Sequence, residues 1–445
     1  MIARGGAALA MLVVLAAGPL AAAERSGFEP TSTLVRADTT ASRAVARAAA
    51  TAWCGSPSQT DRVPNAVAGP AVHWVYAFPS DGGDGLAGLA SVMQSDAEAI
   101  DGWWRGFDPA RAPRNDVTSF PCGQQLDITS LRLSRGAAQL APLPGRFSAI
   151  VDDVERAGLR SPFVKVVVYY DGEVAEQNVC GQGGTEPDGF GVAITYYRAC
   201  TGVSTPAVSV HELLHSFGAV ARGAPNECTG EDRAHTCDDE ADLLYPRIGG
   251  EPLTAKLLDP GFDDYYAHPG AWTDVHDSPW LVRSDSQVPL ALSISGSGSV
   301  SADVPGLLCS ASCTTTWNGG QPLTLTATPG PGARLVRWGG ACSGAAACTL
   351  AVTSGAAVSA QFAPATFRLR VAVRGRGVVR SSGAGIACRP RCSAALPSFT
   401  PVRLTATPAK GWRLRSWSGA CRGANRTCSV PMRAAASARA TFVRR

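Results

Sequence analysis

The chain has 445 residues, among them fourteen cysteines and six histidines, and its formal net charge is +4 at pH 7. That total hides an asymmetry, because residues 1–287 carry a formal charge of −14 whereas residues 364–445 carry +17 and contain no Asp or Glu. After the N-terminus, no segment supplies the about 20 apolar residues of a membrane-spanning helix, and no motif for reading bases is present. We therefore expect no transmembrane span and no specific nucleic-acid recognition.

The first residues are typical of a secretory signal peptide. Arg4 precedes a short apolar run from Ala7 to Leu20, and Ala21–Ala23 then supplies an A-x-A cleavage site. We assign residues 1–23 to the signal peptide and residues 24–50 to an N-terminal segment or pro-region. The even number of cysteines agrees with export, so we expect a secreted, extracellular bacterial protein, with the cell envelope as an alternative location.

Residues 51–285 mix helix-like and strand-like patterns, which predicts an α/β domain. A first strand is expected from His73 to Phe78 and a helix from Leu86 to Arg105. Two β-rich runs follow, Phe163 to Tyr170 and Val192 to Tyr197, and both are predicted strands.

The most informative motif is HExxH, which occurs once, from His211 to His215. On a helix, positions i and i+4 share a face, so both imidazoles can reach one metal ion. Zinc accepts imidazole nitrogen, and a catalytic zinc keeps one position for water, from which Glu212 would take a proton. Pro206 suits a first helical turn and Gly218 a left-handed C-terminus, so a short helix carrying the motif is predicted.

This region resembles the metzincin branch of zinc metallopeptidases, whose motif HExxHxxGxxH is followed by a Met-containing turn. The matching positions are His211, Glu212, His215 and Gly218. Ala221 stands at the third histidine, and Asp242 to Pro246 resembles the turn with Leu244 in place of Met. The resemblance implies an α/β (α+β) domain with a mixed sheet, an active-site helix, one catalytic Zn²⁺ and an edge strand that pairs with extended substrate. The run 192–197 is in the right place for that edge strand, with an ordinary core strand as the alternative.

The third zinc ligand must come from elsewhere, because Ala221 cannot bind metal. His235 is the only histidine in the loop between the helix and the turn, and it is the first choice. Asp238 and Asp239 are the alternatives, since a carboxylate ligand is ordinary zinc chemistry. His268 and His276 are more distant candidates. The acidic residues of the same loop raise Ca²⁺ as a second cofactor, although they match no EF-hand.

Six cysteines fall in this domain, and sequence alone cannot settle their pairing. Proximity favours Cys228–Cys237, which would close the loop that carries His235, and Cys180–Cys200 around a Gly-rich loop; Cys54–Cys122 remains by elimination. For the first pair, the alternative is a zinc site built on Cys228, His235 and Cys237.

After Ser284 the composition shifts to Ser, Thr, Gly and Val, and Trp338 and Trp417 mark a repeat offset by 79 residues. Residues 288–363 and 364–445 are predicted to form two small all-β modules, stapled by local disulfides. The expected bridges are Cys309–Cys313, Cys342–Cys348, Cys388–Cys392 and Cys421–Cys428. The units resemble bacterial extracellular modules of the InlB B-repeat type, which implies spacer or surface-attachment roles.

Together these features predict a monomeric, secreted zinc endopeptidase that acts on a peptide or protein substrate. In that interpretation His211, His215 and His235 hold the zinc and Glu212 is the general base. The basic second repeat would be drawn to an anionic polysaccharide or lipopolysaccharide. Two alternatives stay open: a catalytically decayed, non-enzymatic surface adhesin, suggested by the departures from the motif, and a zinc amidase acting on cell-wall peptide.

Overall fold

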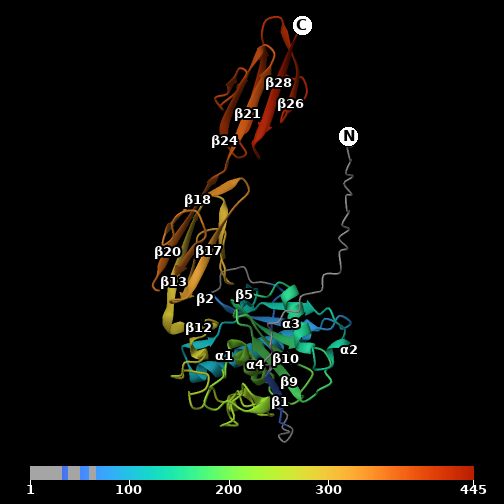
Figure 1. The fold of residues 1–445 in the computed structure, drawn as a ribbon, viewed down its shortest axis with the longest axis vertical. Coiled ribbons are helices and arrows are strands. Elements are labelled where there is room, and N and C mark those ends of the chain that lie inside the picture. The colour runs from blue at the N-terminus through green and yellow to red at the C-terminus, as the bar shows by residue number, and fades with distance from the viewer. Residues whose placement is uncertain (1–32, 39–50, 60–66) are drawn as a thin grey trace, which may run out of the picture.

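The computed structural model describes residues 33–38, 51–59 and 67–445 (Figure 1). The expected signal peptide, residues 1–23, lies outside them, as does most of the expected N-terminal segment. A mixed α/β domain is followed by two all-β repeats that extend from it one after the other. Among the described residues, no helix is both long and apolar enough to cross a membrane.

A seven-stranded sheet forms the centre of the α/β domain. In sheet order its strands are β11 (Arg247–Ile248), β1 (Thr33–Ala37), β9 (Val179–Thr185), β10 (Gly191–Tyr196), β8 (Val164–Tyr170), β3 (Ala71–Phe78) and β7 (Ile128–Arg132). The four strands from β10 to β7 are parallel. The largely apolar sequences of β10, β8 and β3 fit strands buried on both faces, whereas β7 is the edge strand. By contrast, β9 is antiparallel to β10, and β1 is antiparallel to β9. The predicted α/β character and the three predicted strands are thus confirmed.

Helices cover both faces of this sheet. They are α1 (Leu86–Phe107), α2 (Ala137–Leu140), α3 (Arg146–Arg156) and α4 (Thr205–Phe217). Helices α1 and α4 share one core with Trp74 of β3, whereas α3 shares the other core with Val75, its neighbour in sequence. This follows from strand geometry, because successive side chains point to opposite faces. Helix α1 confirms the expected helix from Leu86 to Arg105.

Short elements complete the domain. They are β2 (Val67–Ala68), β4 (Arg111–Pro113), β5 (Val117–Phe120), β6 (Gly123–Leu126), β12 (Leu281–Arg283) and the 3₁₀ turns η1 (Gly230–Asp232), η2 (Leu253–Ala255), η3 (Val275–Asp277) and η4 (Ser284–Ser286). Strand β12 pairs with β4 and closes the domain just before the first repeat begins.

Strand β10 lies between β9 and β8, so for the run 192–197 the ordinary core strand is confirmed and the edge strand is wrong. The sequence also predicts a Gly-rich loop after Cys180, whereas Val179–Thr185 is strand β9. Its glycines are explained by the close approach of α4: a Cβ built on Gly183 would lie 2.4 Å from the carbonyl oxygen of Glu212.

Each repeat is built from two packed sheets around its own core. The first repeat contains β13 (Gln287–Ser295), β14 (Gly298–Ala302), β15 (Leu308–Cys309), β16 (Cys313–Asn318), β17 (Pro322–Pro329), β18 (Ala333–Gly340), β19 (Cys348–Ala351) and β20 (Ala356–Pro364). The second contains β21 (Thr366–Arg374), β22 (Gly377–Ser381), β23 (Ala387–Cys388), β24 (Arg391–Pro397), β25 (Pro401–Pro408), β26 (Trp412–Gly419), β27 (Thr427–Pro431) and β28 (Ala436–Arg444). Equivalent strands pair in the same order, which confirms the duplication.

All fourteen cysteines form disulfides, and the seven pairs are those expected from the sequence. The pairing of Cys228 with Cys237 is incompatible with a zinc site built on these two thiolates. The first repeat is joined to the α/β domain through β16, which pairs with β2.

Candidate metal centre

Helix α4 presents the HExxH motif inside the domain. It begins after Ser204, has Pro206 in its first turn and ends at Gly218, whose φ of 89° is the left-handed conformation that favours glycine. Every residue from Ala207 to Phe217 is buried, so the helix is held between the sheet and the chain that follows it.

Three histidine side chains converge beside this helix. The Nε2 atoms of His211 and His215 lie 3.1 Å apart, and the candidate ligand nitrogens of His211, His215 and His235 all lie within 4.8 Å of one another. Two nitrogens bound to tetrahedral zinc at about 2.0–2.1 Å are about 3.3 Å apart. The helix pair therefore already has a ligand-like separation, and His235 needs to shift by about 1.5 Å at most.

His235 lies on the hairpin that the Cys228–Cys237 disulfide closes. The backbone N–H of Cys228 donates to the His235 carbonyl at 2.8 Å, and the N–H of Thr236 donates to the Leu244 carbonyl at 3.0 Å. His235 Nδ1 lies 3.1 Å from the carbonyl oxygen of Asp232, so this nitrogen carries the hydrogen. The lone pair is then on Nε2, which is buried and has no hydrogen-bond partner among the described residues.

Burial keeps all three rings neutral. It lowers the pKa of His211 and of His215 well below the ordinary value, and the neighbouring histidines lower both further. Burial also lowers the pKa of His235 to about 4. A neutral imidazole is the form that binds a metal, and a buried nitrogen lone pair without a partner is costly. The residues present therefore fit a zinc ion, with three protein nitrogens of the kind that catalytic zinc sites use.

Glu212 lies on the sheet side of the same helix. It is 0% exposed, and neither carboxylate oxygen has a well-formed hydrogen bond among the described residues. Burial raises the pKa of Glu212 well above its ordinary value, and the backbone N–H of Val35 in β1 opposes that shift. A Cβ at Gly181 of β9 would lie 2.7 Å from Glu212 Oε1, so this glycine makes room for the carboxylate.

The turn after the hairpin orients the first histidine. His211 Nδ1 donates to the carbonyl oxygen of Leu243 at 2.6 Å, which leaves Nε2 for a metal. The preceding Asp242 is 0% exposed and accepts bonds from the Leu244 N–H and the Tyr265 hydroxyl, both at 2.7 Å. The role of the Leu243 carbonyl is invisible in the sequence, because a backbone acceptor has no residue preference.

The other candidate ligands lie elsewhere. Asp238 is exposed, and Asp239 accepts a bond from the Ala241 N–H, so neither alternative joins the histidines. His268 stacks on Trp272, and His276 lies beside Asp277. Among the described residues, no metal-capable group is formed by the acidic side chains of the loop expected to bind calcium.

Strand β1 pairs with β9 on the side away from β10 (Figure 1). It runs antiparallel to β9, with Leu34 opposite Gln182, and parallel to β11, with Arg36 opposite Arg247. Val35, at the middle of β1, is 0% exposed. A hollow of about 280 Å³ opens beside His215, with Arg222 and Arg233 in its wall.

Among solved structures, wild-type OgpA from Akkermansia muciniphila is similar at 11% identity and a TM-score of 0.27, over 85% of this chain and 98% of that one. Catalytically inactive OgpA in complex with an O-glycopeptide substrate is similar at 10% identity and a TM-score of 0.26, over 87% and 99%. The Bacillus anthracis TIE protein is similar at 9% identity and a TM-score of 0.24, over 37% of this chain and 35% of that one.

A search of curated proteins finds no match to the chain. A family comparison is informative for the C-terminal part alone. Residues 290–366 and 389–445 match the family described as divergent InlB B-repeat domain. The two disulfide-stapled repeats are therefore modules of that family, which, with the seven disulfides, indicates an extracellular protein.

Proposed function

We propose that the α/β domain is a zinc-dependent endopeptidase. The main support for the proposal is the position of His235. This residue lies on a separate, disulfide-closed hairpin, yet its side chain is close to the two helix histidines. Two histidines one turn apart are common in a packed core, but a third buried, neutral imidazole with an unpartnered Nε2 requires a different explanation. A metal ion bound by the three nitrogens supplies the missing partner.

In the proposed reaction, bound zinc supplies a Lewis acid and lowers the pKa of water. Glu212 accepts the proton of the attacking water and delivers it to the departing amine. Its burial suits this role, because burial raises the pKa of Glu212, and a raised pKa makes a carboxylate a better proton acceptor. The Leu243 carbonyl holds the ring of His211 in the required tautomer.

The position of β1 supports an extended polypeptide as the substrate. A peptide in that position would be paired with β9 on one side and β11 on the other, which is recognition by strand addition. We propose that residues 24–50 are a pro-region whose segment Thr33–Ala37 fills the substrate position and brings Val35 next to Glu212. On this proposal, substrate enters only when β1 has left.

The test is the substitution Glu212→Gln in the full chain, with Glu231→Gln, an exposed acid of the same region, as the control. Loss of the general base should reduce peptide hydrolysis by about 100-fold or more. Zinc content should be unchanged, because the amide replaces no ligand. Equal activity of Glu212→Gln and the wild type would remove Glu212 as the base. A zinc-loaded protein that hydrolyses no peptide even when β1 is loosened by Val35→Ala would favour the adhesin.

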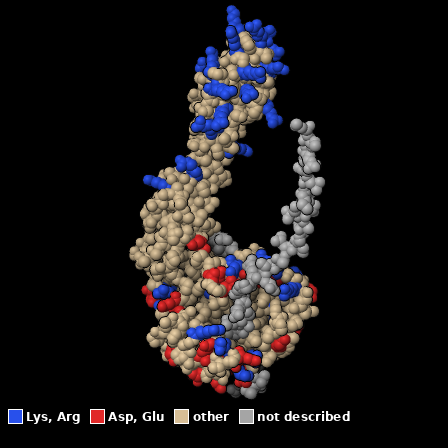
Figure 2. Space-filling model, viewed as in Figure 1, with Lys and Arg blue, Asp and Glu red and all other residues tan. Residues whose placement is uncertain are grey.

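For the repeats we propose attachment to an anionic surface. They belong to a family of extracellular modules, and the second repeat is densely basic (Figure 2). Among the described residues of both repeats, no metal-capable cluster occurs, so a catalytic role has no support there.

A further inference from the structure

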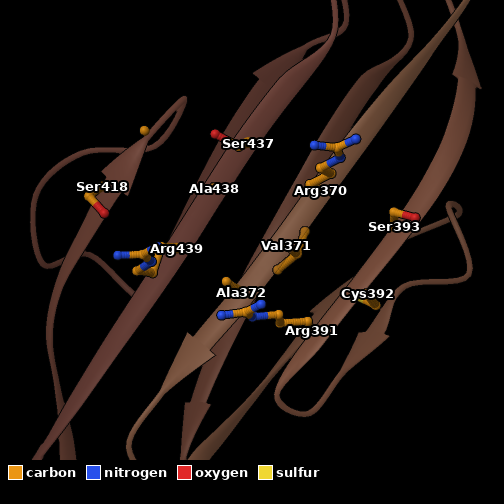
Figure 3. Close-up of a pocket in the computed structure, with 11 residues that line it drawn as sticks. Arg370, Val371, Ala372, Arg391, Cys392, Ser393, Ser418, Ser437, Ala438 and Arg439 are labelled. Carbon is orange, nitrogen blue, oxygen red and sulfur yellow. The ribbon is translucent and has the colours of Figure 1, made fainter.

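A hollow of about 550 Å³ lies on one face of the second repeat, on the sheet formed by β24, β21, β28 and β26 (Figure 3). Three exposed arginines, Arg370, Arg391 and Arg439, stand around it, each on a different strand. Small side chains line the space between them: Ala372, Ser393, Ser418 and Ser437. Because these side chains are short, the three guanidinium groups border an open trough.

The strand register fixes the spacing of the arginines. Ala372 of β21 is opposite Arg391 on one side and Arg439 on the other, so these arginines are two strands apart. Their backbones are therefore separated by about 9–10 Å. Arg370 lies two residues before Ala372 on the same face, between Ser393 and Ser437. The result is a triangle of positive charges across three strands.

These charges are not neutralised within the module. Residues 364–445 contain no Asp or Glu, and in the described chain no ion pair or side-chain hydrogen bond engages Arg370, Arg391 or Arg439. Figure 2 shows the Lys and Arg side chains concentrated at this end of the molecule and the Asp and Glu side chains on the α/β domain. The trough is thus a place where an anion would be held by charge-assisted hydrogen bonds.

The first repeat shows that the fold does not require these arginines. Arg370 of β21 corresponds to Ala291 of β13, which has the same register and lies opposite Thr314 and Ala357. Arg439, which lies opposite Ala372, corresponds to Ser359, which lies opposite Ser293. By the 79-residue offset, Ser312 corresponds to Arg391. The same sandwich therefore forms with Ala, Ser and Ser at the three positions, so the arginines serve something other than folding.

We propose that this trough, named here the arginine trough (Arg370, Arg391 and Arg439), binds an extended anionic polysaccharide. It deepens the attachment role proposed above by giving it a site and a ligand class. A polymer with regularly spaced anionic groups matches charges spread across three strands. The trough contains no aromatic side chain on which bases could stack, which disfavours single-stranded nucleic acid. Among the described residues of this repeat, Phe399 is the one exposed large hydrophobic side chain, so it offers little to insert into a bilayer.

The experiment compares two full-chain triple variants that lose the same charge. The trough variant is Arg370→Ala, Arg391→Ser and Arg439→Ser, which installs the residues of the first repeat. The control, Arg380→Ser, Arg403→Thr and Arg433→Thr, also installs first-repeat residues; Arg380 and Arg403 lie on the other sheet of the module and Arg433 follows its strand β27. The probe is a size-defined heparin oligosaccharide, and its affinity is measured by titration at several salt concentrations.

Loss of three charge-assisted contacts should weaken binding about 100-fold in the trough variant and at most about fivefold in the control. Thermal unfolding should be the same in both, because the first repeat folds with these residues. Equal weakening in both variants would overturn the trough and leave a diffuse attraction by net charge. No binding by the wild type would overturn the attachment role as well. Tighter binding of single-stranded DNA or of anionic phospholipid vesicles than of the glycan would overturn the ligand class.

Discussion

Removal of part of the Val35 side chain tests the proposal that β1 is a displaceable occupant of the substrate position. Val35 is 0% exposed and packs in the core shared by α1 and α4. Val35→Ala should loosen β1 without adding any group to the site. Because substrate and β1 compete for the edge of β9, the variant should hydrolyse peptides faster than the wild type.

The size of the effect follows from the buried surface. The substitution removes the equivalent of two buried CH₂ groups, or about 1.5 kcal/mol. Since about 1.4 kcal/mol is tenfold in an equilibrium constant, the open fraction should rise about tenfold. As long as the closed form predominates, kcat/KM for a peptide should rise by the same factor, because only the open form binds substrate.

The assay is the initial rate of cleavage of a fluorogenic peptide library by zinc-loaded full-length protein, alongside thermal unfolding. The matched control is Val75→Ala, the same substitution at a residue of β3 that is also 0% exposed. That variant should lose stability without gaining activity. If Val35→Ala instead matches the control in both measurements, β1 is an ordinary strand of the sheet and the pro-region proposal fails.

Two further predictions concern the turn and the hairpin. Replacing Cys228 and Cys237 by Ala should lower the unfolding free energy by about 2–3 kcal/mol, which is the loop-closure value for a short bridge. The same variant should bind zinc about tenfold more weakly. As the control, replacing Cys54 and Cys122 by Ala should leave zinc affinity unchanged. Burial raises the pKa of Asp242 to about 7. Between about pH 4 and pH 7 the folded protein therefore keeps a proton on Asp242 that the unfolded chain has released. Because of this difference, the contribution of Asp242 makes the free energy of unfolding fall as pH rises through that window. Asp242→Asn should remove this pH dependence, which amounts to at most about 4 kcal/mol in the free energy of unfolding across the window. The measurement is urea unfolding at several pH values, and the prediction is contradicted if the stability of the variant changes with pH as much as that of the wild type.

The helix with the motif was predictable because its information is local. Pro206 and Gly218 mark the two ends, and the apolar residues between the ligands face the core. The third histidine was a weaker inference. Sequence named His235 because it is the one histidine in the loop, but its position depends on the disulfide hairpin and on bonds to the Leu243–Leu244 turn, which are long-range contacts.

The errors arose where tertiary packing overrides local preference. Val179–Thr185 contains three Gly, which disfavour a strand, yet it forms β9 because it pairs with β10 and β1. Gly183 is needed there because a side chain would meet the backbone of α4. The run 192–197 is rich in β-formers, but such composition cannot distinguish an internal strand from an edge strand. Strand β1 escaped notice because it is five residues long and its partners are far away in sequence.

The most direct test of the central claim is a zinc titration of metal-stripped full-length protein in competition with a chromophoric chelator. The account predicts one zinc ion per chain, an affinity about 100-fold lower or more in His235→Ala, and an affinity within about threefold of the wild type in Asp239→Ala. A chain that binds no zinc, or a His235→Ala variant that binds zinc as tightly as the wild type, would contradict the three-histidine centre.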